Sequence, residues 1–154
     1  MNEFNFSVPQ NIIVGRGSMA KLPEVAKKMG GKHAFIISGP HLKKMGLVEK
    51  AAESLRAEGI LVDDFTDIEG NPSVTTVEAA TEAFQASGAD FIVALGGGSS
   101  IDTAKGIGIV VNNPDFADVK SLEGVADTKH KAVPTFALPT TAGTAAEVTI
   151  NYVI

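Results

Sequence analysis

The sequence predicts an α/β domain built on a doubly wound, mainly parallel sheet. Short runs rich in β-branched and apolar residues alternate with segments of helical periodicity, the order expected when helices cover both faces of a parallel sheet. Residues 91–95 are apolar at every position, as in a strand that is buried on both faces. This run leads directly into Gly96, Gly97 and Gly98, and glycines that follow a strand indicate a tight turn into the next helix.

The other elements follow from periodicity and turn residues. The predicted strands are residues 4–7 and 12–15, which form a ribbon around Pro9-Gln10, and then 34–38, 60–65, 89–95 and 132–138. The first predicted helix covers residues 18–29, with Ser18 as its N-cap and Pro23 as a candidate break. The other predicted helices are the stripe Leu47, Val48, Ala51, Ala52 and Leu55, which Gly59 ends, and residues 74–86 and 99–111. Residues 112–131 are polar and turn-rich and are expected to connect the last helix to the last strand.

Composition argues against several classes of function. The chain has 154 residues, of which 44% are hydrophobic, enough for the core of one domain. Its net charge is −5 and it has no cluster of lysine or arginine, which argues against a nucleic-acid surface. The absence of cysteine excludes disulfides, thiolate zinc sites and a cysteine nucleophile. The sequence shows no signal peptide and no segment of transmembrane length, so a cytoplasmic location without a membrane partner is expected.

The strongest functional signal is the run from Gly96 to Lys105, Gly-Gly-Gly-Ser-Ser-Ile-Asp-Thr-Ala-Lys. Three glycines let the backbone approach a ligand closely, and the free N–H groups and the dipole of the following helix favour negative charge. The run therefore predicts a phosphate site, with a dinucleotide pyrophosphate as the first candidate. A structural interpretation stays open beside it, in which Ser99 is an N-cap, Asp102 completes a capping box and Lys105 is a surface partner of Asp102.

Two further loops are expected at the same edge of the sheet, because the carboxyl ends of parallel strands meet there. The first contains Asn71 before Pro72. The second carries Thr140, Thr141 and Thr144, whose hydroxyls can bind a ribose or a phosphate without adding charge. Both sequences also suit plain turns with side-chain capping, so each loop keeps a structural and a ligand-binding interpretation.

Together these motifs resemble those of the iron-containing alcohol dehydrogenases, and among them the subgroup of lactaldehyde reductases and 1,3-propanediol dehydrogenases. The resemblance rests on Asn71-Pro72, on the run from Gly96 to Lys105, and on residues 139–149, Pro-Thr-Thr-Ala-Gly-Thr-Ala-Ala-Glu-Val-Thr. It extends over essentially the whole chain. It implies a Rossmann-like domain at residues 1–154 that binds NAD or NADP, followed in the family by an all-helical domain that carries divalent iron.

The resemblance also implies roles for individual residues. The candidate coenzyme-binding residues are Gly39, Asn71, Gly96, Gly97, Gly98, Ser99, Asp102, Thr140, Thr141 and Thr144. The pyrophosphate is expected on Gly97, Gly98 and Ser99, and the threonines are expected along the nucleotide and the nicotinamide. Asp102 is the candidate for a catalytic role within this chain, and two placements stay open for it: facing the nicotinamide pocket, or capping the helix.

No metal site is expected in this chain. The family's iron ligands, an aspartate and three histidines, belong to the helical domain. The histidines present here, His33, His41 and His130, have no spacing that directs two of them to one metal. We therefore expect the chain by itself to bind coenzyme without turnover.

Coenzyme preference is predicted from Gly39. NAD-preferring relatives carry an aspartate at this position, where a carboxylate accepts hydrogen bonds from the adenosine ribose and repels a 2′-phosphate. Glycine removes both effects, so NADP is expected to be tolerated or preferred. Lys43 and Lys44 are either cations for that phosphate or a solvated pair at a helix start.

The resemblance implies hydride transfer between a nicotinamide coenzyme and a small alcohol or aldehyde, polarised by iron in the complete enzyme. A homodimer is expected, with pairing through the ribbon at residues 4–15, and nucleic acid is not expected as a partner. An alternative of another class stays open: a stand-alone nucleotide-binding or oligomerisation module without catalysis. A sugar-phosphate cyclase shares the architecture, but the threonine-rich loop fits the alcohol dehydrogenases better.

Overall fold

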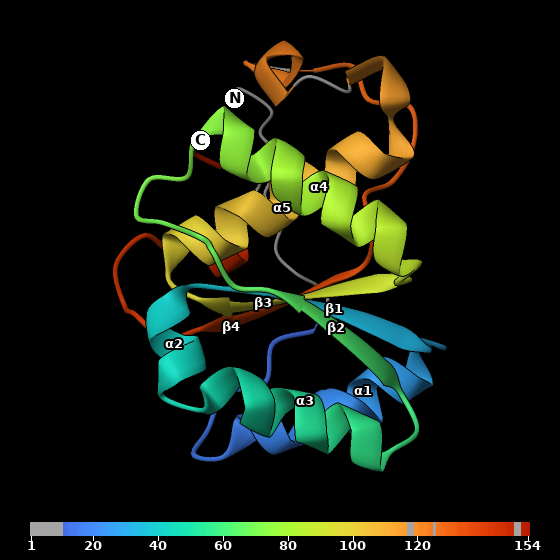
Figure 1. The fold of residues 1–154 in the computed structure, drawn as a ribbon, viewed down its shortest axis with the longest axis vertical. Coiled ribbons are helices and arrows are strands. Elements are labelled where there is room, and N and C mark those ends of the chain that lie inside the picture. The colour runs from blue at the N-terminus through green and yellow to red at the C-terminus, as the bar shows by residue number, and fades with distance from the viewer. Residues whose placement is uncertain (1–10, 117–118, 125, 150–151) are drawn as a thin grey trace, which may run out of the picture.

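The computed structural model describes residues 11–116, 119–124, 126–149 and 152–154, which form an α/β domain (Figure 1). Four parallel strands of this part of the chain form a sheet in the order β2-β1-β3-β4. The strands are β1 (His33–Ser38), β2 (Leu61–Phe65), β3 (Phe91–Gly96) and β4 (Thr135–Pro139). The helices are α1 (Leu22–Lys28), α2 (Pro40–Lys44), α3 (Leu47–Ala57), α4 (Val74–Ser87) and α5 (Gly98–Asn112). Short 3-10 helices lie at Ser18–Lys21, Pro114–Phe116, Val119–Leu122 and Ala146–Val148.

Helices cover both faces of the sheet, with α1 and α3 on one face and α4 and α5 on the other (Figure 1). All six residues of β3 are buried, which explains why this strand is apolar throughout. The edge strand β2 carries Asp63 and Asp64 and is largely exposed. Charged side chains on an edge strand oppose pairing with other sheets. Within the described ranges, no helix is long and apolar enough to cross a membrane.

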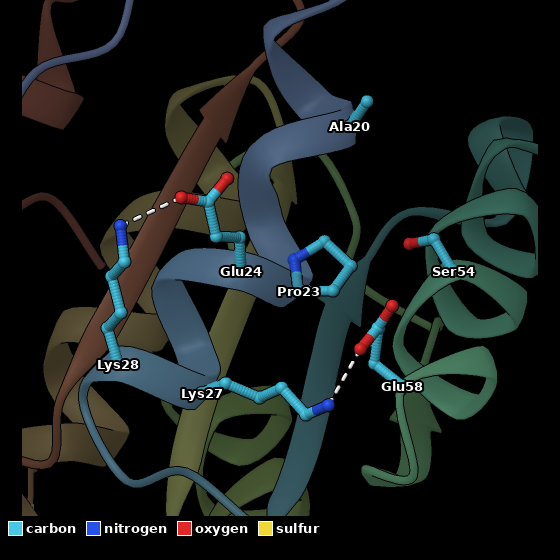
Figure 2. Close-up of a pocket in the computed structure, with 7 residues that line it drawn as sticks. All are labelled: Ala20, Pro23, Glu24, Lys27, Lys28, Ser54 and Glu58. Atoms are coloured by element: carbon cyan, nitrogen blue, oxygen red, sulfur yellow. Dashed lines mark hydrogen bonds and ion pairs between the residues drawn. The ribbon is translucent and has the colours of Figure 1, made fainter.

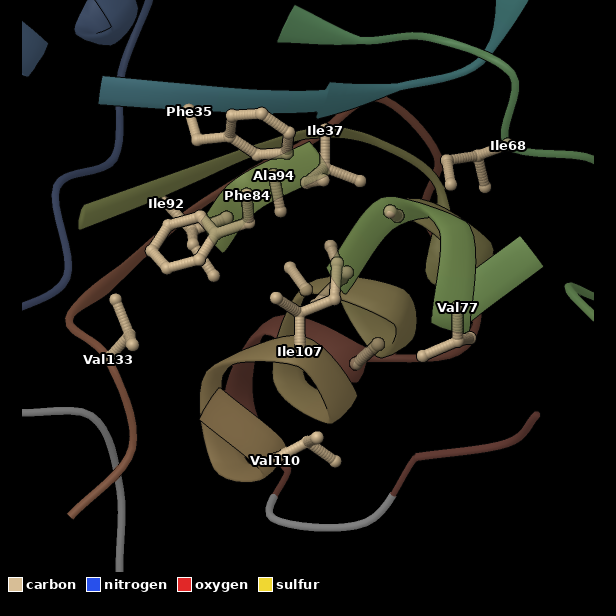
Figure 3. Close-up of a cluster of buried hydrophobic side chains, with 14 of the residues drawn as sticks. Phe35, Ile37, Ile68, Val77, Phe84, Ile92, Ala94, Ile107, Val110 and Val133 are labelled. Carbon is tan, nitrogen blue, oxygen red and sulfur yellow. The ribbon is translucent and has the colours of Figure 1, made fainter. Parts of the chain in front are cut away.

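Two apolar cores lie on the two faces of the sheet, because strand side chains alternate between faces. Toward α4 and α5, Phe35 of β1 packs in the same cluster as Phe84 and Ile107 (Figure 3). The rings of Phe35 and Phe84 meet edge to face, with centroids 5.4 Å apart and planes at 89°. Toward α1 and α3, Ile36 packs in a second cluster with Leu55. These cores hold the strand ends, and thus the loops that follow them, in fixed relative positions.

Asn113 anchors the connection between α5 and β4 and is only 3% exposed. Its Nδ2 donates to the carbonyls of Ile109 at 2.9 Å and His130 at 3.0 Å, while its Oδ1 accepts from the N–H groups of Lys129 at 3.1 Å and His130 at 2.9 Å. The amide thus uses both donors and both acceptor positions. Part of the predicted polar loop is therefore tied to the end of the helix.

The N-terminal part of the chain differs from the expectation. Residues 12–15 do not form a strand, and Val14 is 89% exposed. A strand needs a neighbour for its hydrogen bonds, and none of the described strands pairs with this segment. The other half of the predicted ribbon, residues 4–7, lies outside the described residues.

The first predicted helix is divided in two at the proline. Ser18–Lys21 is a 3-10 helix, and α1 starts beside Pro23, which is tolerated in the first turn because its missing N–H has no helical partner there. The prediction that Ser18 is the N-cap is wrong, because Ser18 is already the first residue of the 3-10 helix. The cap is Gly17, whose φ of 77° suits a glycine.

Candidate functional site

The loops that follow the four strands converge at one edge of the sheet. Ser38 pairs in register with Leu95, and Gly96 with Pro139, so the carboxyl ends of β1, β3 and β4 are level. The Thr140 N–H donates to the Gly96 carbonyl at 2.9 Å, which joins the loop after β4 to the glycine turn. The candidate residues of the loops after β3 and β4 therefore lie together at the start of α5.

The glycines of this turn allow close packing by the threonine loop. An added Cβ at Gly97 would lie 3.0 Å from the Thr141 Oγ1, and one at Gly98 would lie 2.9 Å from the Thr144 Oγ1. At Gly96 a Cβ would collide with Ser100, and the φ of 155° also favours glycine. The two threonine hydroxyls thus face the turn so closely that a side chain at either glycine would push against them. Ser100, which fills the space against Gly96, is a structural contributor that the sequence motif did not single out.

The predicted capping box is not formed. α5 begins at Gly98, with Gly97 as its N-cap. At this start of the helix, the Ile101 N–H donates to the Gly97 carbonyl at 3.3 Å. Because Ser99 lies inside the first turn, its hydroxyl does not cap the helix. The N–H groups of a first turn have no partner within their helix, so they face the sheet edge as donors. Free N–H groups at a helix start are the kind of donors that bind anions in other proteins.

Ser99 instead connects the helix start to the loop that contains Asn71. The Asn71 N–H donates to the Ser99 Oγ at 3.4 Å, a long hydrogen bond. Asn71 has a φ of 55°, a left-handed conformation that asparagine tolerates better than most residues. The backbone of the exposed residue Asn71 thus lies beside the start of α5.

Asp102 and Lys105 form a largely buried pair, and not the surface pair of the structural interpretation. Their side chains are only 11% and 17% exposed, and the Lys105 Nζ lies 3.6 Å from the Asp102 Oδ1. The Asp102 Oδ2 accepts from the Val153 N–H at 3.2 Å, and the Lys105 Nζ donates to the Thr149 Oγ1 at 3.2 Å. Burial lowers the pKa of Lys105, and the charge of Asp102 opposes that shift. The pair ties α5 to the last residues of the chain, a role that the motif alone did not indicate.

Thr103 is fully buried on α5, and its hydroxyl has no hydrogen-bond partner within the described part of the chain. Replacing Thr103 with valine keeps the shape of the side chain and removes the unpaired hydroxyl. We therefore expect the free energy of unfolding of the variant to be unchanged or higher by up to about 1 kcal/mol. Urea unfolding of Thr103→Val measures this. Thr81→Val is the matched control, because the Thr81 Oγ1 donates to the Val77 carbonyl at 2.7 Å and its loss should cost about 1 kcal/mol. A loss above 1 kcal/mol for Thr103→Val would contradict the prediction.

Gly39 follows β1 as the N-cap of the short helix α2, with φ −93° and ψ 160°. This extended conformation is open to any residue, although an added Cβ would lie 3.2 Å from the Ile68 carbonyl oxygen. Of the two predicted cations, Lys43 is engaged: its Nζ donates to the Asp64 Oδ2 at 2.9 Å. The hydrogen bond from Lys43 and the charge of Asp64 raise the pKa of this lysine. Asp64, at the end of an edge strand, is a residue that the sequence analysis missed.

The histidines do not form a metal site in the structure. The His33 Nε2 lies 2.7 Å from the Asp63 Oδ2, His41 is exposed on α2, and the backbone of His130 bonds to Asn113. Across the residues that the structure describes, no group of three or more histidine, aspartate or glutamate side chains is placed to hold a metal. These residues therefore do not fit the iron that the resemblance implies for the complete enzyme.

A hollow of the described surface lies elsewhere, between α1 and α3 (Figure 2). It has a volume of about 520 Å³ and is lined by Ala20, Pro23, Glu24, Lys27, Lys28, Ser54 and Glu58. Its charged groups are paired: the Lys27 Nζ donates to Glu58 at 2.7 Å and the Lys28 Nζ to Glu24 at 2.8 Å. None of the candidate coenzyme residues lines this hollow. This hollow is therefore separate from the loops at the carboxyl edge that carry the candidate residues.

Comparison with known proteins identifies the family. The family model for iron-containing alcohol dehydrogenase matches residues 9–154. The lactaldehyde reductase of Escherichia coli (strain K12) is 47% identical over 140 residues, which cover 91% of this chain and 37% of the relative. A solved 1,3-propanediol oxidoreductase has a TM-score of 0.90 and 35% identity, over 96% of this chain and 38% of its own. A sulfoacetaldehyde reductase from Bifidobacterium kashiwanohense, solved in complex with NAD⁺, has a TM-score of 0.85 and 29% identity, over 97% of this chain and 39% of its own.

These comparisons confirm the predicted resemblance and the Rossmann-like fold class. The chain spans well under half the length of these relatives, between 37% and 39%. The match lies in the N-terminal part of the family. The chain belongs to the iron-containing alcohol dehydrogenases and corresponds to an N-terminal part of these oxidoreductases.

Proposed function

We propose that residues 1–154 are the coenzyme-binding domain of an NAD(P)-dependent alcohol dehydrogenase or aldehyde reductase. The observation that carries the proposal is the packing of Thr141 and Thr144 against Gly97 and Gly98 at the N-terminus of α5. This packing places backbone N–H donors and uncharged threonine hydroxyls on one surface, a combination that suits a pyrophosphate and its attached riboses. The NAD⁺ complex of the sulfoacetaldehyde reductase, which is similar in fold, supports the same coenzyme class.

In this proposal each candidate residue has a role in binding. The N–H groups of Gly98 and Ser99 face the pyrophosphate, and Gly96 and Gly97 let the backbone approach it. Thr140, Thr141 and Thr144 bind along the nucleotide and the nicotinamide, Asn71 lies beside the coenzyme, and Gly39 lies beside the adenosine ribose. Asp102, held by Lys105, faces the nicotinamide side and is the candidate for a catalytic role.

The bound coenzyme supplies or accepts a hydride, and this chain positions it toward a small alcohol or aldehyde. The described residues do not fit iron, so the role proposed for this chain is limited to the coenzyme. We therefore propose that this chain binds coenzyme without turnover. A cytoplasmic location and a homodimer belong to the same proposal, supported by the cysteine-free composition and by the apolar residues before Gly15.

Titration of the purified protein with NADPH and NADH, followed by nicotinamide fluorescence or by calorimetry, tests the binding role. We expect both coenzymes to bind, with NADPH at least as tight as NADH. Turnover of an alcohol by the pure protein would contradict binding without catalysis. If neither coenzyme binds, the glycine turn serves only as a helix start and the proposal is wrong.

Replacing Gly39 with aspartate is expected to shift the preference toward NADH by about 10- to 100-fold. The new carboxylate accepts ribose hydrogen bonds and repels a 2′-phosphate, a combined effect of about 1.4–2.8 kcal/mol. Gly39→Ala is the matched control, since it adds the same Cβ next to the Ile68 carbonyl without charge, and it should leave the ratio of the two dissociation constants unchanged. An unchanged or increased preference for NADPH in Gly39→Asp would sink the hypothesis.

A further inference from the structure

Lys43 of α2, the lysine nearest to Gly39 along the helix, forms an ion pair with Asp64 of β2. The Lys43 N–H donates to the Gly39 carbonyl at 3.3 Å, so Lys43 lies one helical turn from Gly39. Its Nζ donates to the Asp64 Oδ2 at 2.9 Å. Asp64 lies on β2 in register with Ile36 of β1. The lysine is therefore close to the proposed ribose position, but its charge is already paired.

Acidic groups besides Asp64 act on the charge of Lys43. Asp67 and Glu49 also attract the ammonium group, and together with Asp64 they raise its pKa. The side chains of Lys43 and Asp64 are 55% and 32% exposed, so water reaches the pair and an incoming anion can exchange with the carboxylate. The negative charge of Asp64 repels an incoming phosphate, and this repulsion offsets part of the attraction between the phosphate and Lys43.

We infer that Asp64 determines how well the site accepts a 2′-phosphate, because it competes with that phosphate for Lys43. The inference rests on the proposed function, since it places the adenosine ribose beside Gly39. A positively charged side chain near the ribose is the usual means of accommodating the 2′-phosphate of NADP. Gly39 leaves space for the phosphate, and Asp64 withholds the cation. Coenzyme preference is then set by two residues, Gly39 at the start of α2 and Asp64 on β2, and position 39 alone does not decide it.

Replacing Asp64 with asparagine is expected to tighten NADPH binding by about three- to tenfold and to leave NADH binding within about twofold. The amide removes the competing charge while it keeps the size of the side chain. The loss of the exposed Lys43–Asp64 ion pair and of the partly screened repulsion between Asp64 and the phosphate each change affinity by about this factor. Titration of the purified protein with each coenzyme measures the change.

Two comparisons separate this mechanism from a general charge effect. Asp63→Asn removes the same charge one residue away, but its side chain lies on the other face of β2, where it bonds to His33, so NADPH affinity should change less than about twofold. In the Lys43→Gln background, Asp64→Asn should no longer tighten NADPH binding. This second result is expected only if Asp64 acts through Lys43.

Three outcomes would overturn the inference: equal tightening of NADPH and NADH, equal effects of Asp63→Asn and Asp64→Asn, or an Asp64→Asn effect that persists without Lys43. Thermal unfolding of each variant checks that the fold is retained. Failure of the unmodified protein to bind either coenzyme is a separate result, because it would overturn the proposed function and the inference with it. Binding of both coenzymes with an unchanged ratio in Asp64→Asn would overturn the inference alone.

Discussion

Replacing Gly98 with valine is expected to weaken the binding of both NADPH and NADH by at least about 100-fold. The first added carbon would lie 2.9 Å from the Thr144 Oγ1 and 3.1 Å from its Cγ2, so the threonine loop must move away from the helix start. In the proposed function this removes at least two hydrogen bonds to a charged ligand, each contributing about 1.5–3 kcal/mol. Titration of the variant with each coenzyme measures the loss.

Two further variants show whether the loss has the expected cause. Gly108→Ala adds a carbon to the same helix at an ordinary distance from Val133, 3.4 Å or more, and should bind both coenzymes normally. Gly98→Ala combined with Thr144→Ala relieves the internal contact but still places a Cβ before the ligand. Because Thr144 is itself a proposed binding residue, binding in this double variant should be weaker than in Thr144→Ala alone. Full recovery would mean that Gly98 serves loop packing alone and would contradict its role in the coenzyme site.

Replacing Phe84 with alanine is expected to lower the free energy of unfolding by about 3–5 kcal/mol, as is usual for a buried phenylalanine. Phe84 is 4% exposed on α4 and meets the ring of Phe35 edge to face, so the substitution leaves a cavity and removes an aromatic contact between the helix and β1 (Figure 3). Urea unfolding followed by circular dichroism gives the difference directly.

Phe84→Leu is the matched control for this prediction. Leucine keeps most of the buried volume and loses the ring contact, so we expect a smaller loss, about 1–1.5 kcal/mol. If Phe84→Ala costs less than about 1 kcal/mol, the surrounding cluster collapses into the space and the helix does not depend on this contact.

The order and type of most elements were predictable because their signals are local. The apolar run at residues 91–95 lies in β3, and the stripe from Leu47 to Leu55 lies in α3. Ser73 caps α4 through a hydrogen bond from the Thr76 N–H at 3.2 Å. In each case the residues that decide the structure lie within a few positions of one another. The short helix α2 lacked such a signal, since its five residues are too few to show periodicity.

The candidate site was predictable as a set of loops but not in its contacts. Both Ser99 and Asp102 fit a capping box by spacing, yet the helix starts at Gly98 and their side chains bond to other loops. The competition between capping and tertiary hydrogen bonds depends on where distant segments lie. The Lys43–Asp64 pair is likewise decided by the order of β1 and β2 in the sheet.

By itself, the sequence determined the α/β class, the glycine turn and the family, since glycine placement and hydrophobic periodicity act over short stretches of chain. Only the tertiary structure decided which groups meet there: Thr144 against Gly98, and Asp64 on Lys43. These contacts join residues up to 46 positions apart, as from Gly98 to Thr144. They exist because two packed cores align the parallel strands, which brings distant polar groups together at one sheet edge.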